Sequence, residues 1–222
     1  MSPTLSPDLT DEAARAALQA HVLANGYPCI MATSVLRRDQ ITVGTYSALG
    51  TAEASDALAA DLAAFVREPE PERGFRSFAA VFGGDAPASE ETFEHGLWAT
   101  LQALHDRDDA PWDSEVSADP ASPEFSFSFA GRAFYVVGMH PQASRPARTF
   151  RRPLVLFNLH SQFEQLRAEG RYDRVRDVIR GRDRAFAGSI NPMMDDFGAR
   201  SEARQYSGRA VGADWRCPFH AD

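Results

Sequence analysis

The chain has 222 residues, a formal net charge of −8 and a pI near 5.3. This length fits one domain with a sizeable core, and the acidic balance argues against a general nucleic-acid binder, which needs a basic face. No run approaches the roughly 20 apolar residues of a membrane span, and the two cysteines are too few for a disulfide scaffold and lack CxxC spacing. We therefore expect a reduced, cytoplasmic protein that binds neither nucleic acid nor a membrane.

Charge is distributed unevenly along the chain. Residues 1–144 carry a balance of −13, whereas residues 145–222 carry +5. Every basic residue is an arginine, which excludes lysine-based Schiff-base chemistry and a Walker-type phosphate site. We expect the C-terminal third to be the part of the chain that faces anions.

The N-terminal part predicts a helix followed by paired strands. Residues 1–9 are expected to form a loose leader. A helix begins at Thr10, which two acids follow, and runs to about Leu23. Residues 29–36 and 41–49 carry β-branched side chains on both sides of a polar turn, and this pattern predicts a β-hairpin.

The middle of the chain alternates between helical and strand-like patterns. A second helix is predicted over residues 55–66, a strand over residues 75–82, and a third helix begins at Ser89. In residues 125–129 phenylalanine alternates with serine, which predicts a strand buried on one face.

The last third predicts two more strands and a long helical region. The strands cover residues 133–139 and 154–159, and residues 161–184 are mostly helical with an interruption near Gly170. Residues 189–222 are rich in Gly, Asn and Pro but carry many large apolar groups. A disordered tail would not hold these groups, so we expect an ordered, extended C-terminal segment.

Together these elements predict an α+β fold, with a largely antiparallel sheet flanked by helices. The sequence contains no internal repeat and no linker. Residues 10–222 are therefore expected to form a single domain.

Two histidines stand at the ends of apolar runs and are candidate metal ligands. His140 follows the run that ends at Met139, and His160 follows the run that ends at Leu159. A predicted strand separates them, so they lie either on neighbouring strand ends or at opposite ends of one sheet. Each could instead hydrogen-bond a buried carbonyl near a turn. Nucleotide-binding glycine loops, a GxSxG elbow and an HExxH motif are absent from the sequence.

The surroundings of these histidines favour haem as the cofactor. Arginines close to His140 can pair with propionates, and the neighbouring runs supply apolar walls. Cys217, which precedes a proline, is a second kind of axial candidate, and Cys29 is no stronger; both could be ordinary buried thiols. The arginines are Arg145, Arg148, Arg151 and Arg152, and the wall residues are Phe134, Val136, Met139, Phe150, Phe157 and Phe163.

Five strings form an ordered pattern: FSFSFAGRAFYVVGMHPQASRPARTF, FNLHSQFEQLR, IRGRDRAFAGSINPMMDDFG, SEARQYSGRAV and DWRCPF. From Tyr27 to Phe219, the chain resembles the YqcI/YcgG family of bacterial proteins. Members with assigned roles are haem-dependent N-oxygenases of natural-product pathways such as those of guanitoxin and D-cycloserine. The resemblance implies a haem b enzyme that uses O2 and electrons from a reductase. Its substrate would be a small amine or guanidine, arginine-like or lysine-like, hydroxylated on nitrogen.

The motif positions then receive expected roles. His140 is the predicted axial ligand, and Arg145 and Arg148 are expected to bind the propionates. His160 is the alternative ligand or the group that hydrogen-bonds bound oxygen, and Cys217 is a further alternative ligand. Polar residues expected to orient substrate or oxygen are Asn158, Gln162 and Asn191. Acids that could hold a cationic substrate, or simply be solvated, are Glu164, Asp195 and Glu202.

Two other functions remain open at this point. The protein could be a haem-binding sensor or carrier without turnover. It could also be a non-haem metal protein in which His140, His160 and a carboxylate form a facial triad. A homodimer is likewise left open, and the sequence does not identify the substrate.

Overall fold

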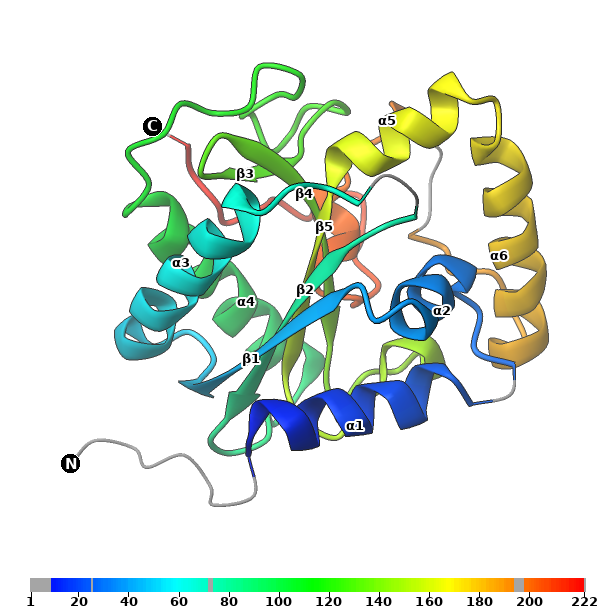
Figure 1. Ribbon diagram of the computed structural model, residues 1–222, viewed down its shortest axis with the longest axis horizontal. Helices are drawn as coiled ribbons and strands as arrows, with labels where there is room; N and C mark the ends of the chain where they lie inside the picture. The colour runs from blue at the N-terminus through cyan, green and yellow to red at the C-terminus, as the bar shows by residue number, and fades with distance from the viewer. Residues whose placement is uncertain (1–8, 25, 72–73, 194–197, 222) are drawn as a thin grey trace.

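A computed structural model describes residues 9–24, 26–71, 74–193 and 198–221. Within these residues, seven α-helices, one short 3-10 helix and five strands form a single α+β domain (Figure 1). This fold class is the one that the sequence predicts. The predicted leader lies outside the described residues except for Leu9, which is buried.

The five strands form one mixed sheet in the order β1-β2-β5-β4-β3. β1 and β2 are parallel, whereas the other three neighbouring pairs are antiparallel. The largely antiparallel sheet is therefore confirmed. The strands are β1 (Ile41–Ala48), β2 (Ser77–Gly83), β3 (Phe127–Phe129), β4 (Arg132–Met139) and β5 (Leu154–Leu159).

Helices cover both faces of the sheet (Figure 1). α3 and α4 pack on one face around a large aromatic core, and α1 and α2 pack on the other face around a smaller core. α6 packs against α2, α5 and the short helix η1. The helices are α1 (Asp11–Val22), α2 (Ile30–Arg37), α3 (Ala52–Arg67), α4 (Glu90–His105), η1 (Pro146–Arg148), α5 (His160–Ala168), α6 (Tyr172–Ala187) and α7 (Ala203–Tyr206).

Polar caps and glycines set several helix boundaries where the sequence predicts them. The hydroxyl of Thr10 accepts a hydrogen bond from the first turn of α1, and Ser89 does the same for α4. Gly170 has a φ of 64° between α5 and α6, and Gly188 has a φ of 76° at the end of α6. These left-handed conformations favour glycine, which explains why the helical region breaks at these points.

The predicted hairpin over residues 29–36 and 41–49 is wrong in its first half, because residues 30–37 form α2. Cys29 caps this helix, and its Sγ accepts a hydrogen bond from the backbone N–H of Ala32. α2 buries Val35 and Leu36 against the second core. Burial of this face and the cap outweigh the β-propensity of the branched residues.

The strand over residues 125–129 is buried on both faces and not on one as predicted. Ser126 and Ser128 are as fully enclosed as the phenylalanines between them. The hydroxyl of Ser126 donates to Glu202, and the hydroxyl of Ser128 accepts from the backbone N–H of Asp113. These hydrogen bonds satisfy the buried hydroxyls, and the partner residues belong to other segments of the chain.

The C-terminal segment is ordered in its described part, as predicted. Tyr206 and Phe219 are fully buried in the aromatic core. Close approach of this segment to β4 requires Gly138, since a Cβ there would lie 2.8 Å from the carbonyl oxygen of Tyr206. Among the described residues, no helix is long and apolar enough to cross a membrane.

Candidate functional site

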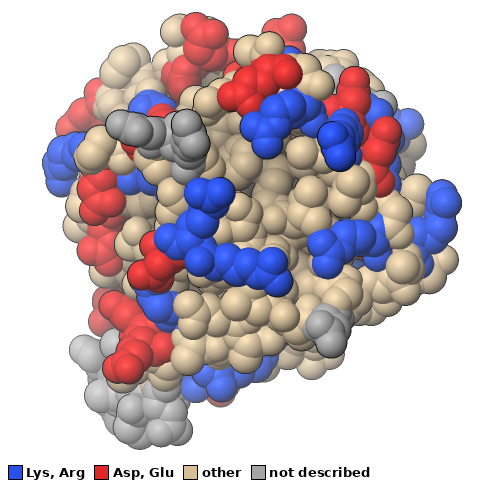
Figure 2. Space-filling view, turned by 45° about the vertical axis from the view of Figure 1, so that its right-hand side comes forward, with Lys and Arg blue, Asp and Glu red and all other residues tan. Residues whose placement is uncertain are grey.

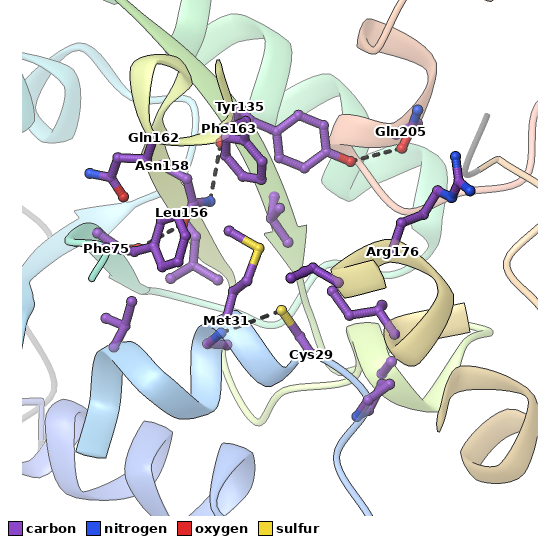
Figure 3. A pocket seen from close by; sticks show the side chains of 18 of the residues that line it. Cys29, Met31, Phe75, Tyr135, Leu156, Asn158, Gln162, Phe163, Arg176 and Gln205 are labelled. Carbon is purple, nitrogen blue, oxygen red and sulfur yellow. Dashed lines mark hydrogen bonds between the residues drawn. The ribbon is translucent and has the colours of Figure 1, made fainter. Parts of the chain in front are cut away.

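A cavity of about 260 Å³ lies on the α2 and α6 side of the sheet. This volume is just below the roughly 300–1,000 Å³ typical of small-molecule sites. Its walls come mainly from α2, β4, β5, α5 and α6, and apolar side chains line most of it (Figure 3). Figure 2 shows the surface on this side, where basic side chains surround a hollow.

Strand alternation determines which side chains reach the cavity. On β4, Tyr135 and Val137 line it, and on β5, Leu156 and Asn158 line it. The residues between them point to the aromatic core on the opposite face, because successive side chains of a strand alternate. One set of strands therefore supplies both a core and a cavity wall.

Cys29 lies in the cavity wall at the start of α2. Its sulfur points inward beside the side chain of Met31 (Figure 3). Burial raises the pKa of the thiol, and this effect exceeds the opposing effects of the backbone N–H groups of α2 and of Arg148 and Arg182. The thiol is therefore protonated when the cavity is empty. A metal ion would displace the proton, and the helix start and the arginines would then favour the thiolate.

His160, the first residue of α5, lines the same cavity and is 5% exposed. Its Nε2 lies 3.7 Å from Oε1 of Glu164. Burial lowers the pKa of His160 more than this carboxylate raises it. The imidazole is therefore neutral at pH 7, which is the form that binds metals.

Arginines form a large part of the charged lining. Arg145 donates to Asp183 at 2.8 Å, and Arg148 donates to the backbone oxygens of Gly138 and Gln205. These two guanidinium groups therefore join separate segments of the chain. The arginines among the described lining residues are Arg145, Arg148, Arg167, Arg176, Arg180 and Arg200.

Arg167 and Arg176 make ion pairs of a different kind. Arg167 pairs with Glu164 on its own helix, and Arg176 pairs with two exposed aspartates of α6. Exposed pairs of this type are weak, so a ligand carboxylate can replace the side-chain carboxylate at small cost.

Among the described lining residues, two carry carboxylates. Asp183 is held by Arg145 and by the backbone N–H of Asn191. Glu202 is 7% exposed, and its Oε1 accepts hydrogen bonds of 2.5 Å from the hydroxyls of Ser126 and Tyr206. Burial raises the pKa of Glu202 to about 7. The cavity thus combines apolar walls, arginines, a thiol, an imidazole and two buried carboxyl groups, of which Asp183 is paired with an arginine.

The sequence profile of the YqcI/YcgG family matches residues 18–220, which include the strands of the sheet and the cavity. The chain belongs to the YqcI/YcgG family. It is similar to the uncharacterized protein YcgG of Bacillus subtilis (strain 168), with 24% identity over 206 residues, 88% of this chain and 81% of that protein. No solved structure matches the chain. The family resemblance seen in the sequence is therefore confirmed.

In this YqcI/YcgG protein, His140 does not line the cavity. It is fully buried after the end of β4, and its ring stacks on Phe93 of α4 with the ring centroids 4.2 Å apart. Within the described residues, neither ring nitrogen has a hydrogen-bond partner, and burial lowers the pKa of the imidazole. The position of His140 in the core gives no support to its predicted role as axial ligand.

The strand register also separates His140 from His160. Met139 pairs with Leu154 at one end of β4, and Phe134 pairs with Leu159 at the other end. Five residues of antiparallel strand span about 17 Å, so the two histidines lie at opposite ends of the sheet. The structure does not bring them together as a facial triad. Within the described part of the chain, no group of three or more His, Cys, Asp or Glu side chains could hold a metal ion.

The predicted polar residues do reach the cavity, but they also have structural roles. Gln162 bonds both backbone groups of Arg76 through its amide. Asn158 accepts from Ser77 and donates to the backbone oxygen of Tyr135. Asn191 lies in the lining and is 6% exposed. We infer that the hydrogen bonds of Asn158 and Gln162 stabilise the cavity wall.

Most of the predicted apolar wall belongs to the cores. Phe163 lines the cavity, whereas Phe157 lies in the aromatic core and Phe150 in the second core. Cys217 packs against the aromatic core, and burial raises its pKa to about 12. Other predicted wall residues that lie in these cores are Phe134, Val136 and Met139.

Other predicted positions lie outside the cavity lining. Arg151 and Arg152 are not among the lining residues, and Glu164 is bound to Arg167. Asp195 lies outside the described residues. The sequence pattern did not predict that Tyr135 lines the site, and it gave Cys29 no special role. Cys29 is the N-cap of α2, but the sequence pattern predicted a strand at this point, so the position at a helix start was not recognised.

Proposed function

We propose that this protein is a haem-dependent monooxygenase that hydroxylates a nitrogen of a small amine or guanidine substrate. O2 and electrons from a separate reductase would be consumed. The observation that carries the proposal is the composition of the cavity. Its apolar walls include a thiol and an imidazole, Cys29 and His160, which are groups that bind haem iron, and arginines line it as well. Haem is a planar, largely apolar ring system with two propionates, so its binding site needs both apolar walls and arginines.

Cys29, in place of His140, is the residue that would hold the haem iron. Its sulfur is the cavity thiol, it lies at a helix start, and Arg148 and Arg182 favour its thiolate. Bound haem b would supply activation of O2, which a thiolate ligand promotes. His160 is the second candidate donor, and its neutral imidazole can hold or accept a proton at Nε2.

The remaining wall residues have roles that follow from their chemistry. The apolar side chains, such as Val137 and Leu156, exclude water. Arg167 and Arg176 can exchange their exposed partners for propionates. Since the cavity holds only about 260 Å³, haem binding requires side chains on the wall to move. α6 can provide this space, because only Asp183 of its residues is buried.

Absorption spectroscopy of the purified protein tests the cofactor and its ligand. We expect a Soret band, which Cys29→Ala abolishes or shifts from a thiolate-type to another spectrum. Cys217→Ala is the matched control, because this second cysteine lies outside the cavity lining. A colourless protein that does not take up haemin contradicts the proposal. A spectral change with His160→Ala and none with Cys29→Ala would assign the iron ligand to His160.

Turnover is tested separately with the reduced haem protein. We expect O2 consumption with arginine-like or lysine-like amines and a product that carries one isotopic oxygen on nitrogen. Firm haem binding without label incorporation across an amine and guanidine panel, with a competent electron supply, would instead support a haem sensor or carrier.

A further inference from the structure

Glu202 differs from the other carboxylate of the cavity in its lack of a cationic partner. Asp183 is paired with Arg145 at 2.8 Å. Among the described residues, no basic side chain lies within ion-pair distance of Glu202, although Arg167 is close enough to lower its pKa slightly against the larger effect of burial. Glu202 is nonetheless buried, since only 7% of the residue is exposed.

The hydrogen bonds of Glu202 leave one oxygen for a ligand. Oε1 accepts from the hydroxyls of Ser126 and Tyr206, and these bonds fix the position of the side chain. Within the described part of the chain, Oε2 accepts no hydrogen bond. Buried carboxylates are normally paired, because an unpaired buried charge is costly. A cationic ligand in the cavity would supply the missing partner.

Glu202 lies among other polar groups of the cavity wall, which include Tyr135 and Gln205. The hydroxyl of Tyr206 donates to Glu202, and the ring of Tyr206 lies 6.1 Å from the ring of Tyr135, measured between centroids. Tyr135 is therefore a near neighbour of Glu202 on this wall. It is held by a hydrogen bond of 2.7 Å to Gln205 (Figure 3). These hydrogen bonds hold Glu202 and Tyr135 in place on the cavity wall.

We propose that Glu202 is the residue that binds the guanidinium or ammonium group of the substrate through Oε2 and selects cationic over neutral ligands. This inference rests on the proposed function for the reaction, but it concerns binding and does not require the haem. Arginines elsewhere in the lining would take the carboxylate of an amino-acid substrate. The substrate class is then a molecule with a cationic nitrogen at one end and a carboxylate at the other.

Calorimetric binding of arginine and its neutral isostere citrulline tests the proposal, with the protein both haem-free and haem-loaded. Lysine and agmatine complete the panel. The original protein should prefer arginine, and Glu202→Gln should weaken arginine binding at least tenfold, as expected for the loss of a charge-assisted hydrogen bond worth about 1.5–3 kcal/mol. Citrulline binding should change little, because glutamine has nearly the same shape as glutamate and can form a hydrogen bond to the urea group of citrulline.

Glu169→Gln is the matched control, since Glu169 is an exposed acid after α5 and is absent from the cavity lining. It should leave both affinities unchanged. Equal losses for arginine and citrulline in Glu202→Gln would indicate a merely structural role and overturn the inference. Failure of every panel member to bind the original protein would also overturn it.

The two proposals fail in different ways. Glu202-dependent selection of arginine in a protein that takes up no haem would leave the inference standing and remove the proposed function. Oxygen transfer to arginine by a Glu202→Gln protein with unchanged selectivity would keep the proposed function and remove the inference.

Discussion

The two faces of the sheet are built from the same strands but differ in what covers them. On the α3 and α4 face, aromatic side chains such as Phe134 and Phe157 are completely enclosed. On the α2 and α6 face, their neighbours Tyr135, Leu156 and Asn158 line a cavity. Alternation along each strand therefore places neighbouring residues in a closed core and in a cavity wall. Changes on one face should affect folding, and changes on the other should affect ligands.

Two adjacent residues of β5 provide the strongest test of the difference between the two faces of the sheet. Phe157→Ala removes a fully buried ring and should lower the free energy of unfolding by about 3–5 kcal/mol. Leu156→Ala enlarges an existing cavity and should cost less than about 2 kcal/mol. Urea denaturation measures both values. Similar costs for the two variants would contradict the contrast between the faces.

Glu202 should make the cavity face dependent on pH. Burial raises its pKa from 4.5 to about 7, so the folded protein binds this proton more tightly than the unfolded chain does. The resulting stabilisation is complete below pH 4.5 and is lost as the pH rises through 7. Glu202→Gln should remove this loss.

Denaturation of both proteins across this pH range measures the effect. The difference between their free energies of unfolding should change in favour of Glu202→Gln by about 3 kcal/mol from acidic to alkaline pH. Other titrating groups contribute equally to both proteins and cancel. A difference that stays constant with pH would show that Glu202 is not perturbed by burial.

The outer wall of the cavity offers a smaller and more local test. Asp183→Asn removes the charged partner of Arg145 and should destabilise the attachment of α6 by about 2 kcal/mol. Hydrogen exchange of the α6 amides should accelerate, while the amides of β5 stay protected. Asp177→Asn, on the exposed side of the same helix, is the control and should have little effect. Uniform acceleration across the sheet would argue against a separately anchored α6.

The smallest expected effect concerns His140. His140→Leu replaces a ring that stacks on Phe93 in the aromatic core and has no hydrogen-bond partner among the described residues. Haem retention should remain that of the original protein, because His140 does not line the cavity. A haem titration measures it. Loss of haem in this variant, with a folded circular dichroism spectrum, would restore the original prediction of His140 as the ligand.

The sequence predicted those parts of the fold that depend on local interactions. The starts of α1 and α4 follow from the hydroxyls of Thr10 and Ser89, and the break between α5 and α6 follows from Gly170. α2 was missed because the burial of Val35 and Leu36, which stabilises it, depends on distant parts of the chain. Local propensity does not contain that information.

The candidate site was predictable only in part. Several of the predicted site residues line one cavity, including Arg145, Arg148, Asn158, His160 and Gln162. His140 lies outside the cavity lining, because a one-residue step along the strand decides which face of the sheet a side chain joins, and the sequence alone did not fix that step. Glu202 and Cys29 meet on one cavity through contacts between the two ends of the chain, which no local pattern reveals.

The arginines around the cavity have a consequence for the speed of ligand capture. Since the chain contains no lysine, the positive charge of these side chains does not titrate in the physiological range, and acetylation of lysine cannot remove it. The contribution of these arginines to the association of anionic ligands should therefore respond to ionic strength and not to pH in the physiological range. Added salt screens the attraction over a Debye length of about 10 Å at 0.1 M, which slows encounter while leaving the apolar contacts inside the cavity intact.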